Sequence, residues 1–267
     1  AFVETVGLQG ASFSADESRI LFSSNKTGVW NAYSLPAKGG EWTPVTRSTG
    51  DNHYAVAYFP HDDRVLVTRD QGGKDLTPGE KLKAAFFGFS QDGKRFFVQT
   101  NERDPKYFDL YRYDATTYAR ELLYENTSGL SVGAISPDQR WLALEKPVTT
   151  NDSDLFVHEL ATGKTTKVSA HTSEANFSAM DFSPDSQWLY YTANDAGEFT
   201  ELRRVNLATQ QHESVRKADW DVTDAFFSHN GKYLVSAIND DGTTRVQLTD
   251  TASGKVVLGV RRRGGRR

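Results

Sequence analysis

The sequence predicts an all-β fold made of repeated antiparallel sheets, and three observations support this. Residues that favour strands are abundant, with 16 Phe, 11 Tyr and 5 Trp in 267 residues. Six segments share a strand, a polar turn rich in Asp, Asn, Gly or Pro, and a second strand, which is the pattern of a β-hairpin. The residues that open these turns recur at a nearly constant distance along the chain.

The spacing of the six turns sets the size of the repeat. The opening residues are separated by 46, 30, 46, 47 and 45 positions, and they are Ser14, Pro60, Ser90, Ser136, Ser183 and Ser228. Four-stranded propeller blades repeat every ~40 to 50 residues. We therefore expect a six-repeat β-propeller with four-stranded antiparallel blades, and we number the segments repeats 1 to 6.

Repeat 2 is shorter than the others. Eleven residues after the opening position, four repeats place an asparagine that begins the turn into a third strand, namely Asn25, Asn101, Asn194 and Asn239. In repeat 2 this position is Gln71, and Gly72 and Gly73 follow it without a third strand. The spacing is 16 residues short of 46, and the gap falls between Lys74 and Asp75. We expect the second blade to be truncated.

Composition and charge exclude several classes of protein. The net charge is -4, but five of the 31 basic residues lie in the final "RRRGGRR", and the remainder carries -9. An acidic body argues against a nucleic-acid groove. No apolar run approaches the ~20 residues that span a bilayer, and the absence of cysteine excludes disulfides.

These features also set the expected domain and location. We expect a single propeller domain over residues 1–260 and a basic disordered tail over 261–267, because arginine and glycine cannot build a core. The start "AFVETV" has no signal region. The protein is therefore either cytoplasmic, or periplasmic or secreted after removal of a targeting segment.

The repeats resemble those of a known family. "SPDQRWLALE" and "SPDSQWLYYT" are similar to the TolB-type, WD40-like propeller repeat, and the run from "DNHYAVAYFPHDDRVLVTRDQGG" to "FFGFSQDGKRFFVQTNERDPKYFDLYRYD" resembles the N-terminal propeller of bacterial prolyl-oligopeptidase-family peptidases. In those peptidases the propeller caps an α/β-hydrolase domain and selects the peptides that reach the active site. The sequence stops where that domain would begin. The resemblance implies a non-catalytic propeller that binds peptide or protein at its channel mouth.

One segment matches a catalytic motif. "GLSVG", residues 129–133, fits the G-x-S-x-G pattern of a nucleophile elbow. An elbow requires a strand, a sharp turn and a helix, whereas Ser131 lies five residues before Ser136, within the predicted first strand of its repeat. We therefore interpret Ser131 as a small residue of an inner strand and expect no serine-hydrolase chemistry.

Polar residues precede each inner strand, where they would surround the mouth of a propeller channel. Position seven before each turn is Gly7, His53, Lys83, Gly129, Asn176 or Asp221, and Asp51, Glu80, His171, Glu174 and Asp219 lie nearby. We predict that a peptide or small-molecule ligand binds in the channel, and that the binding residues at its mouth are His53, Lys83, Asn176, Asp221, Glu174 and Asp219. Alternatively, these residues only satisfy strand ends in a solvated funnel.

A second functional hypothesis is a promiscuous metal-assisted hydrolase acting on an ester or phosphoester. Histidines and carboxylates from different repeats could hold a divalent metal such as zinc and activate its bound water. The candidate ligands are His53, His171 and Glu174. No H-x-H or H-E-x-x-H spacing fixes this set.

The truncation also predicts an assembly. "RVLVTRD", residues 64–70, loses the third strand that would pair with it, and an open strand edge pairs readily with another chain. We therefore expect a homo-oligomer, most simply a two-fold dimer joined near the second repeat.

Overall fold

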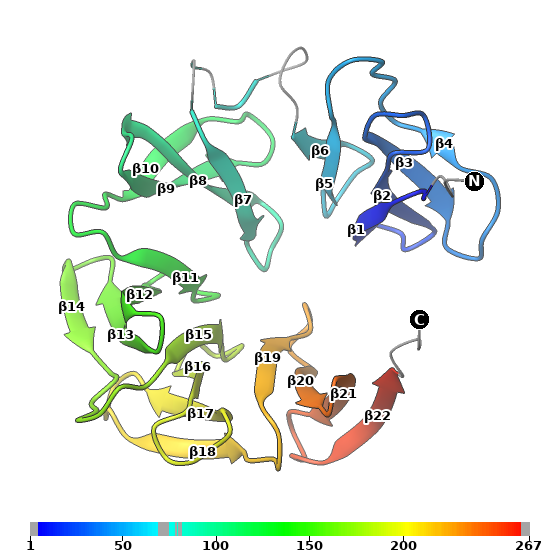
Figure 1. Cartoon of the computed structure of the whole chain (residues 1–267). Coiled ribbons are helices and arrows are strands. Elements are labelled where there is room, and N and C mark those ends of the chain that lie inside the picture. Colours follow the sequence, from blue (N-terminus) through cyan, green and yellow to red (C-terminus); the bar gives the residue numbers. More distant parts are fainter. Residues whose placement is uncertain (1–4, 69–74, 78, 80–81, 263–267) are drawn as a thin grey trace. The chain divides into compact units, whose positions relative to one another are not determined.

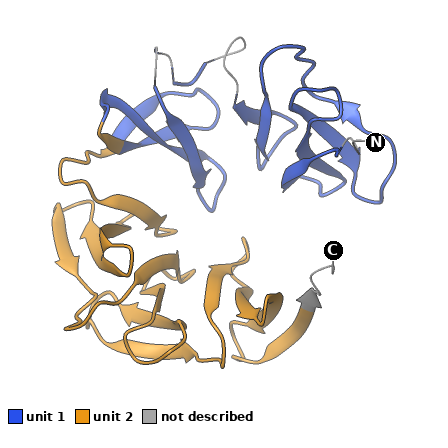
Figure 2. Cartoon of the chain, viewed as in Figure 1, with its two compact units in different colours: residues 1–105, 109–122 blue, residues 106–108, 123–267 orange. Residues whose placement is uncertain are grey.

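The computed structural model describes residues 5–68, 75–77, 79 and 82–262. The regular secondary structure of these residues consists of strands (Figure 1). Among them no helix could cross a membrane. The chain divides into two compact units (Figure 2), residues 1–105 with 109–122, and residues 106–108 with 123–267.

Repeats 1 to 3 form three antiparallel sheets, which lie in the first unit apart from the start of β9 and the end of β10. The strands of repeat 1 are β1 (Leu8–Phe13), β2 (Arg19–Ser24), β3 (Asn31–Pro36) and β4 (Thr43–Pro44). Repeat 2 contributes β5 (Tyr54–Tyr58) and β6 (Val65–Thr68). Repeat 3 contributes β7 (Ala84–Phe89), β8 (Arg95–Asp104), β9 (Tyr107–Asp114) and β10 (Arg120–Tyr124).

Repeats 4 to 6 form three four-stranded sheets in the second unit. The strands of repeat 4 are β11 (Ser131–Ile135), β12 (Trp141–Thr149), β13 (Asp152–Glu159) and β14 (Lys164–Lys167). Those of repeat 5 are β15 (Phe177–Phe182), β16 (Trp188–Ala193), β17 (Glu201–Asn206) and β18 (His212–Arg216). Those of repeat 6 are β19 (Val222–Phe227), β20 (Tyr233–Asp240), β21 (Thr243–Asp250) and β22 (Val256–Arg262).

We expected six blades, but the described residues form five, because repeat 2 does not form a four-stranded sheet. Five repeats form four-stranded sheets, whereas β5 and β6 form a two-stranded sheet. Between β6 and β7 the structure describes residues 75–77, 79, 82 and 83, and none of these lies in a strand. Gln71, Gly72 and Gly73 lie outside the described residues, as do Glu80 and positions 263–267 of the predicted tail.

A serine closes the inner hairpin of every four-stranded repeat. Its Oγ accepts a hydrogen bond from the backbone N–H five residues later, at 2.9 to 3.0 Å, in the pairs Ser14–Arg19, Ser90–Arg95, Ser136–Trp141, Ser183–Trp188 and Ser228–Tyr233. The same hydroxyl donates to an Asp or Asn two residues on, for example to Asp138 at 2.6 Å. The turn therefore satisfies its own polar groups, which explains why this serine marks the repeat so regularly.

The turns of repeats 1 and 2 differ in the residue that opens them. In repeat 1, hydrogen bonds from Ser14 and Ser18 lower the pKa of Asp16 to about 2. In repeat 2 the opening residue is Pro60, which has no hydroxyl group. There Arg64 supplies its backbone N–H and its guanidinium to Asp62. This turn is closed without the serine, so the two-stranded sheet differs from the four-stranded sheets in its turn chemistry.

Successive sheets within each unit are joined by apolar cores. In the second unit, repeats 4 and 5 share a cluster that includes Leu155, Phe182 and Tyr191, and repeats 5 and 6 share one that includes Leu202 and Ile238. A buried carboxylate links the latter pair, because Asp181 accepts the backbone N–H of Phe227 at 2.8 Å. Burial raises the pKa of Asp181. Neighbouring repeats are thus held by specific polar contacts as well as by apolar packing.

A matched pair of substitutions tests the serine closure. Ser136 is 1% exposed, and Ser136→Ala leaves the amides of Arg140 and Trp141 without their hydroxyl acceptor. We expect a loss of about 1–2 kcal/mol in the free energy of unfolding, measured by chemical denaturation. Ser131→Ala, at an exposed position of the same repeat, should change it by less than about 0.5 kcal/mol. Equal effects of the two substitutions would contradict this role.

Candidate functional site

The positions predicted to surround a channel mouth begin the inner strands, and an asparagine holds their backbone. The side-chain Oδ1 atom of the asparagine 18 residues later accepts the backbone N–H of this position at 2.7 Å, in the pairs Asn25–Gly7, Asn101–Lys83 and Asn194–Asn176. From the sequence, we expected these asparagines only to begin turns. Their regular spacing was the available signal for this second role.

Two predicted site residues lie in the first unit. His53 donates its backbone N–H to the Trp30 carbonyl at 2.8 Å, and its Nδ1 atom is buried without a hydrogen-bond partner among the described residues. Lys83 is exposed, and its backbone carbonyl accepts the N–H of Asn101. The side chain of Lys83 is therefore accessible from solvent, whereas its backbone N–H and carbonyl are both hydrogen-bonded to Asn101.

Both ring nitrogens of His171, in the second unit, lie within hydrogen-bond distance of other protein atoms. Its Nε2 atom lies 2.9 Å from Asp152 Oδ1, its Nδ1 atom lies 3.1 Å from the Ser169 carbonyl, and its side chain is 9% exposed. Both neighbours are hydrogen-bond acceptors, so both ring nitrogens point toward oxygen atoms of the protein. Neither nitrogen presents a lone pair to a metal in this arrangement.

The other predicted residues of the second unit differ in their surroundings. Glu174 and Asn176 are exposed. Asp221 uses its carboxylate to accept the backbone N–H of Thr200 at 2.9 Å, and its carbonyl accepts that of Asn239. This residue therefore fixes the strand ends around it. Asp219 is exposed and lines a pocket.

The predicted zinc site is not supported. Within the described residues, no three His, Cys, Asp or Glu side chains are grouped so that they could hold a metal ion. Both ring nitrogens of His171 already face oxygen atoms of the protein. A metal cofactor is therefore not established.

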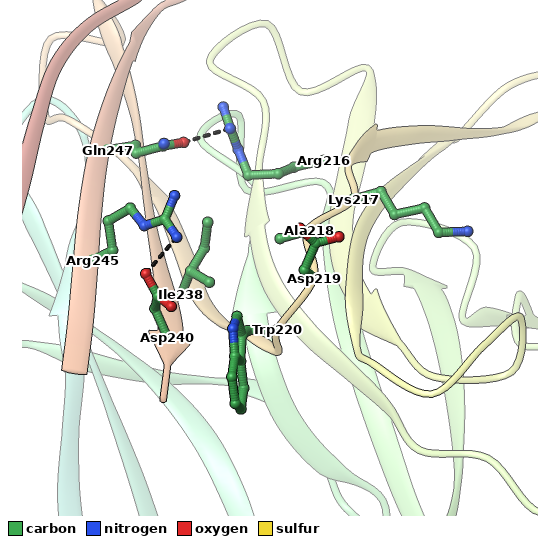
Figure 3. Close-up of a pocket in the computed structure, with 9 residues that line it drawn as sticks. All are labelled: Arg216, Lys217, Ala218, Asp219, Trp220, Ile238, Asp240, Arg245 and Gln247. Atoms are coloured by element: carbon green, nitrogen blue, oxygen red, sulfur yellow. Dashed lines mark hydrogen bonds and ion pairs between the residues drawn. The ribbon is translucent and has the colours of Figure 1, made fainter. Parts of the chain in front are cut away.

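The pocket lies between the segment that joins repeats 5 and 6 and the strands β20 and β21 (Figure 3). It has a volume of about 310 Å³. The lining residues are Arg216, Lys217, Ala218, Asp219, Trp220, Ile238, Asp240, Arg245 and Gln247. The antiparallel pairing of Ile238 with Arg245 places one apolar and one charged residue side by side on β20 and β21.

The charges of the pocket are unevenly paired. Arg245 forms a salt bridge with the buried Asp240 at 2.5 Å. Arg216 instead donates to two neutral groups, the Gln247 amide oxygen and, at 3.2 Å, the Thr249 hydroxyl. Its Nε atom is buried without a partner in the described structure, and burial lowers the pKa of the guanidinium. Arg216 therefore has no carboxylate partner among the residues that the structure describes.

The apolar part of the pocket comes from Trp220 and Ile238. The indole of Trp220 packs against Phe199, with ring centroids 5.7 Å apart, and it also contacts the core shared by repeats 5 and 6. In Figure 3, Trp220 and Arg216 lie at opposite ends of the pocket, and Lys217 points away from it. The described lining contains no serine, cysteine or histidine.

Of the lining residues, only Asp219 was named from the sequence, as a channel-mouth residue. The available signal was "VRKADW", residues 215–220, where two cations, an acid and a tryptophan follow a strand. Asp240, Arg245 and Gln247 gave no such signal, because they reach the pocket only through the register of β20 and β21.

The serine motif lies in a strand. Ser131 begins β11 and pairs with Glu145 of β12. The strand–turn–helix context of a nucleophile elbow is therefore absent at this residue, as the sequence predicted.

Comparison with known proteins addresses the fold. A family model described as WD domain, G-beta repeat matches residues 208–246, and no curated protein matches the chain. An oligogalacturonate lyase in complex with manganese is 17% identical with a TM-score of 0.69, over 94% of this chain and 77% of that one. A putative TolB from Agrobacterium tumefaciens is 16% identical with a TM-score of 0.52, over 95% and 81% of the respective chains.

A structure from a study of two prolyl endopeptidases completes the comparison. It is 16% identical with a TM-score of 0.52, and the alignment covers 99% of this chain but 36% of that protein. The chain has a β-propeller fold. The predicted resemblance to TolB and prolyl-oligopeptidase propellers is confirmed at the level of fold, whereas the likeness to the lyase was not predicted.

Labelling tests the interpretation of Ser131. We expect a fluorophosphonate probe to leave Ser131 unmodified, because Ser131 lies on a β-ladder opposite Glu145 and not at the sharp strand-to-helix turn of a nucleophile elbow. Mass spectrometry of the labelled and digested protein would measure this, with a known serine hydrolase as the positive control. Stoichiometric modification of Ser131 would overturn the interpretation.

Proposed function

We propose that this protein is a non-catalytic propeller that binds a segment of a peptide or protein beside the start of an inner strand. The pocket lined by Asp219 and Trp220 carries the proposal. Both residues lie within three positions of Val222, the first residue of β19, which supports binding near the start of this strand. In this interpretation β5 and β6 are the truncated second blade of a six-repeat propeller.

The chemistry of the pocket supports a peptide ligand. A volume of about 310 Å³ lies at the lower end of the range for ligand pockets and suits a few residues rather than a whole domain. An indole and an isoleucine offer an apolar surface, while charged groups of both signs can pair with polar main-chain and side-chain groups. Mixed linings of this kind are typical of peptide recognition, where an aromatic anchor supplies much of the affinity.

The likeness to prolyl endopeptidases supports the same role. The aligned region spans 36% of that protein, whose inter-domain dynamics are described as contributing to catalysis and specificity. We propose that the present propeller selects peptides in a similar way, without cleaving them itself.

Two tryptophans provide the test. Trp220 and Trp188 are both partly buried against the core shared by repeats 5 and 6, but only Trp220 lines the pocket. In a fluorescence-polarisation screen with a library of labelled tetrapeptides, Trp220→Ala should weaken binding about tenfold or more, as expected for an aromatic anchor. Trp188→Ala should leave the affinity within about twofold if the pocket is the site.

Two outcomes would contradict the proposed function. One is that no peptide in the library binds the wild-type protein. The other is that both tryptophan variants weaken binding equally, which would show that the loss reflects the shared core and not the pocket. Thermal melting of each variant shows whether it remains folded.

We also propose that two copies associate through β6. The backbone N–H of Ala55 donates to Ser23 and that of Tyr58 donates to Ser12, although these residues lie opposite Val67 and Val65 in the ladder. Such pairs do not exchange hydrogen bonds with each other. The main-chain groups of Val65 and Val67 therefore face away from β5, toward an edge where no described strand is paired with β6.

A second copy is the simplest occupant of this edge. An antiparallel two-fold contact lets identical edges satisfy each other's donors and acceptors. The side chains do not compete with this contact, because Val65 and Val67 pack against the core of repeat 1. Pairing would therefore use the backbone of β6 and leave its packing unchanged.

A proline at position 67 tests this assembly. Proline is tolerated where the N–H points away from the neighbouring strand, but it removes the donor that the second copy would need. We expect a dimer for the wild type and for Val67→Thr, which keeps the donor, and a monomer for Val67→Pro. Light scattering measures the molar mass. A monomeric wild type, or a dimer unaffected by the proline, would contradict the proposed contact.

A further inference from the structure

Arg216 differs from the other arginines of the structure in its electrostatic surroundings. Ten arginines form salt bridges with Asp or Glu: Arg19, Arg64, Arg95, Arg103, Arg112, Arg120, Arg140, Arg203, Arg204 and Arg245. Arg47 lacks such a partner but is exposed to water. Among the arginines whose side chains the structure describes, Arg216 alone is partly buried without a carboxylate.

The pKa directions agree with this difference. Neighbouring carboxylates raise the pKa of Arg204 and Arg203 above its ordinary value, despite the burial that opposes them. For Arg216 the only cause is burial, which lowers the pKa of the guanidinium. A guanidinium remains charged in proteins, so its desolvation is compensated only by neutral acceptors.

The two neutral acceptors leave part of the guanidinium unused. Gln247 accepts from Nη1 and Thr249 accepts from Nη2, so each of these nitrogens retains a second hydrogen. Arg216 lines the pocket, and Gln247 and Thr249 lie at alternate positions on β21. The strand therefore holds the guanidinium in place and leaves donor capacity for a ligand.

We propose that the pocket recognises a carboxylate group of its ligand, which pairs with the guanidinium of Arg216. This inference rests on the proposed binding function and assigns the chemical class of ligand. A carboxylate supplies the counter-ion that Arg216 lacks, and guanidinium and carboxylate match in charge and in hydrogen-bond geometry. Arg245 does not serve in this way, because Asp240 already neutralises it. The apolar part of the ligand then lies toward Ile238 and Trp220.

Two sources of carboxylate fit this chemistry. One is the end of a peptide or an acidic side chain, and the other is a uronic acid unit of a sugar, which an indole face can also contact. Three probes distinguish the possibilities: hippurate, which resembles the end of a peptide; hippuramide, its neutral amide; and digalacturonate. Each fits the scale of the pocket.

The experiment is a titration of the full chain with each probe, followed by heteronuclear NMR of the Arg216 Nε–H and Trp220 indole N–H groups. We expect at least one carboxylate probe to shift both signals, and hippurate to bind about tenfold more tightly than hippuramide. Arg216→Gln should abolish this preference, whereas Arg216→Lys should retain part of it. Arg140→Gln removes an exposed arginine outside the pocket and should behave as the wild type.

The outcomes separate this inference from the proposed function. If peptide binding depends on Trp220 but does not change on amidation of the ligand or in Arg216→Gln, the carboxylate inference is wrong and the proposed peptide binding still holds. Binding of digalacturonate without hippurate, lost in Arg216→Gln, would support the carboxylate and identify a sugar acid as its source. If no carboxylate probe shifts either signal, the inference is wrong.

Discussion

The structure depends first on a hydrogen bond from a backbone amide to the serine hydroxyl that closes each inner hairpin. This hydroxyl accepts from the amide five residues later and donates to an acidic or amide side chain in the turn. Because it fixes the turn, it also fixes the register of the two inner strands. The asparagine after the second strand accepts the backbone N–H just before the inner strand of the same repeat, as Asn194 does for Asn176, and this contact depends on that register. Short-range contacts thus set the geometry of each repeat.

The candidate site follows from this geometry. Repeat 5 ends at Arg216, and the connection to repeat 6 brings Asp219 and Trp220 to the start of β19. The pairing of β20 with β21 places Ile238 opposite Arg245, and the same strands carry Asp240 and Gln247. Asp221 holds the connection by accepting the amide of Thr200. Asp221, predicted at the channel mouth, therefore has a structural role. Its neighbours Asp219 and Trp220 line a pocket together with Arg216, whose guanidinium has no described carboxylate partner.

Much of the fold could be predicted from sequence because its determinants are local. Ser136 and Asp138 lie in one turn, and their spacing is visible in the sequence without knowledge of tertiary structure. The site was less accessible. His53, His171 and Glu174 were grouped by counting along the chain, but a count does not give the direction of a side chain, and His171 points to Asp152 and Ser169. Arg216 and Gln247 meet only through contacts between repeats, which no local pattern records.

The fold leaves the guanidinium of Arg216 in a pocket beside an inner strand, and we propose that a ligand carboxylate pairs with it. Crystals soaked with para-bromobenzoate test this pairing, because bromine can be located by its anomalous scattering and the carboxylate lies at the other end of the ring. We expect a bromine peak in the pocket near Trp220, with the carboxylate directed toward Arg216. A pocket without bromine, or a ring bound with its carboxylate directed away from Arg216, would show that Arg216 does not bind the carboxylate.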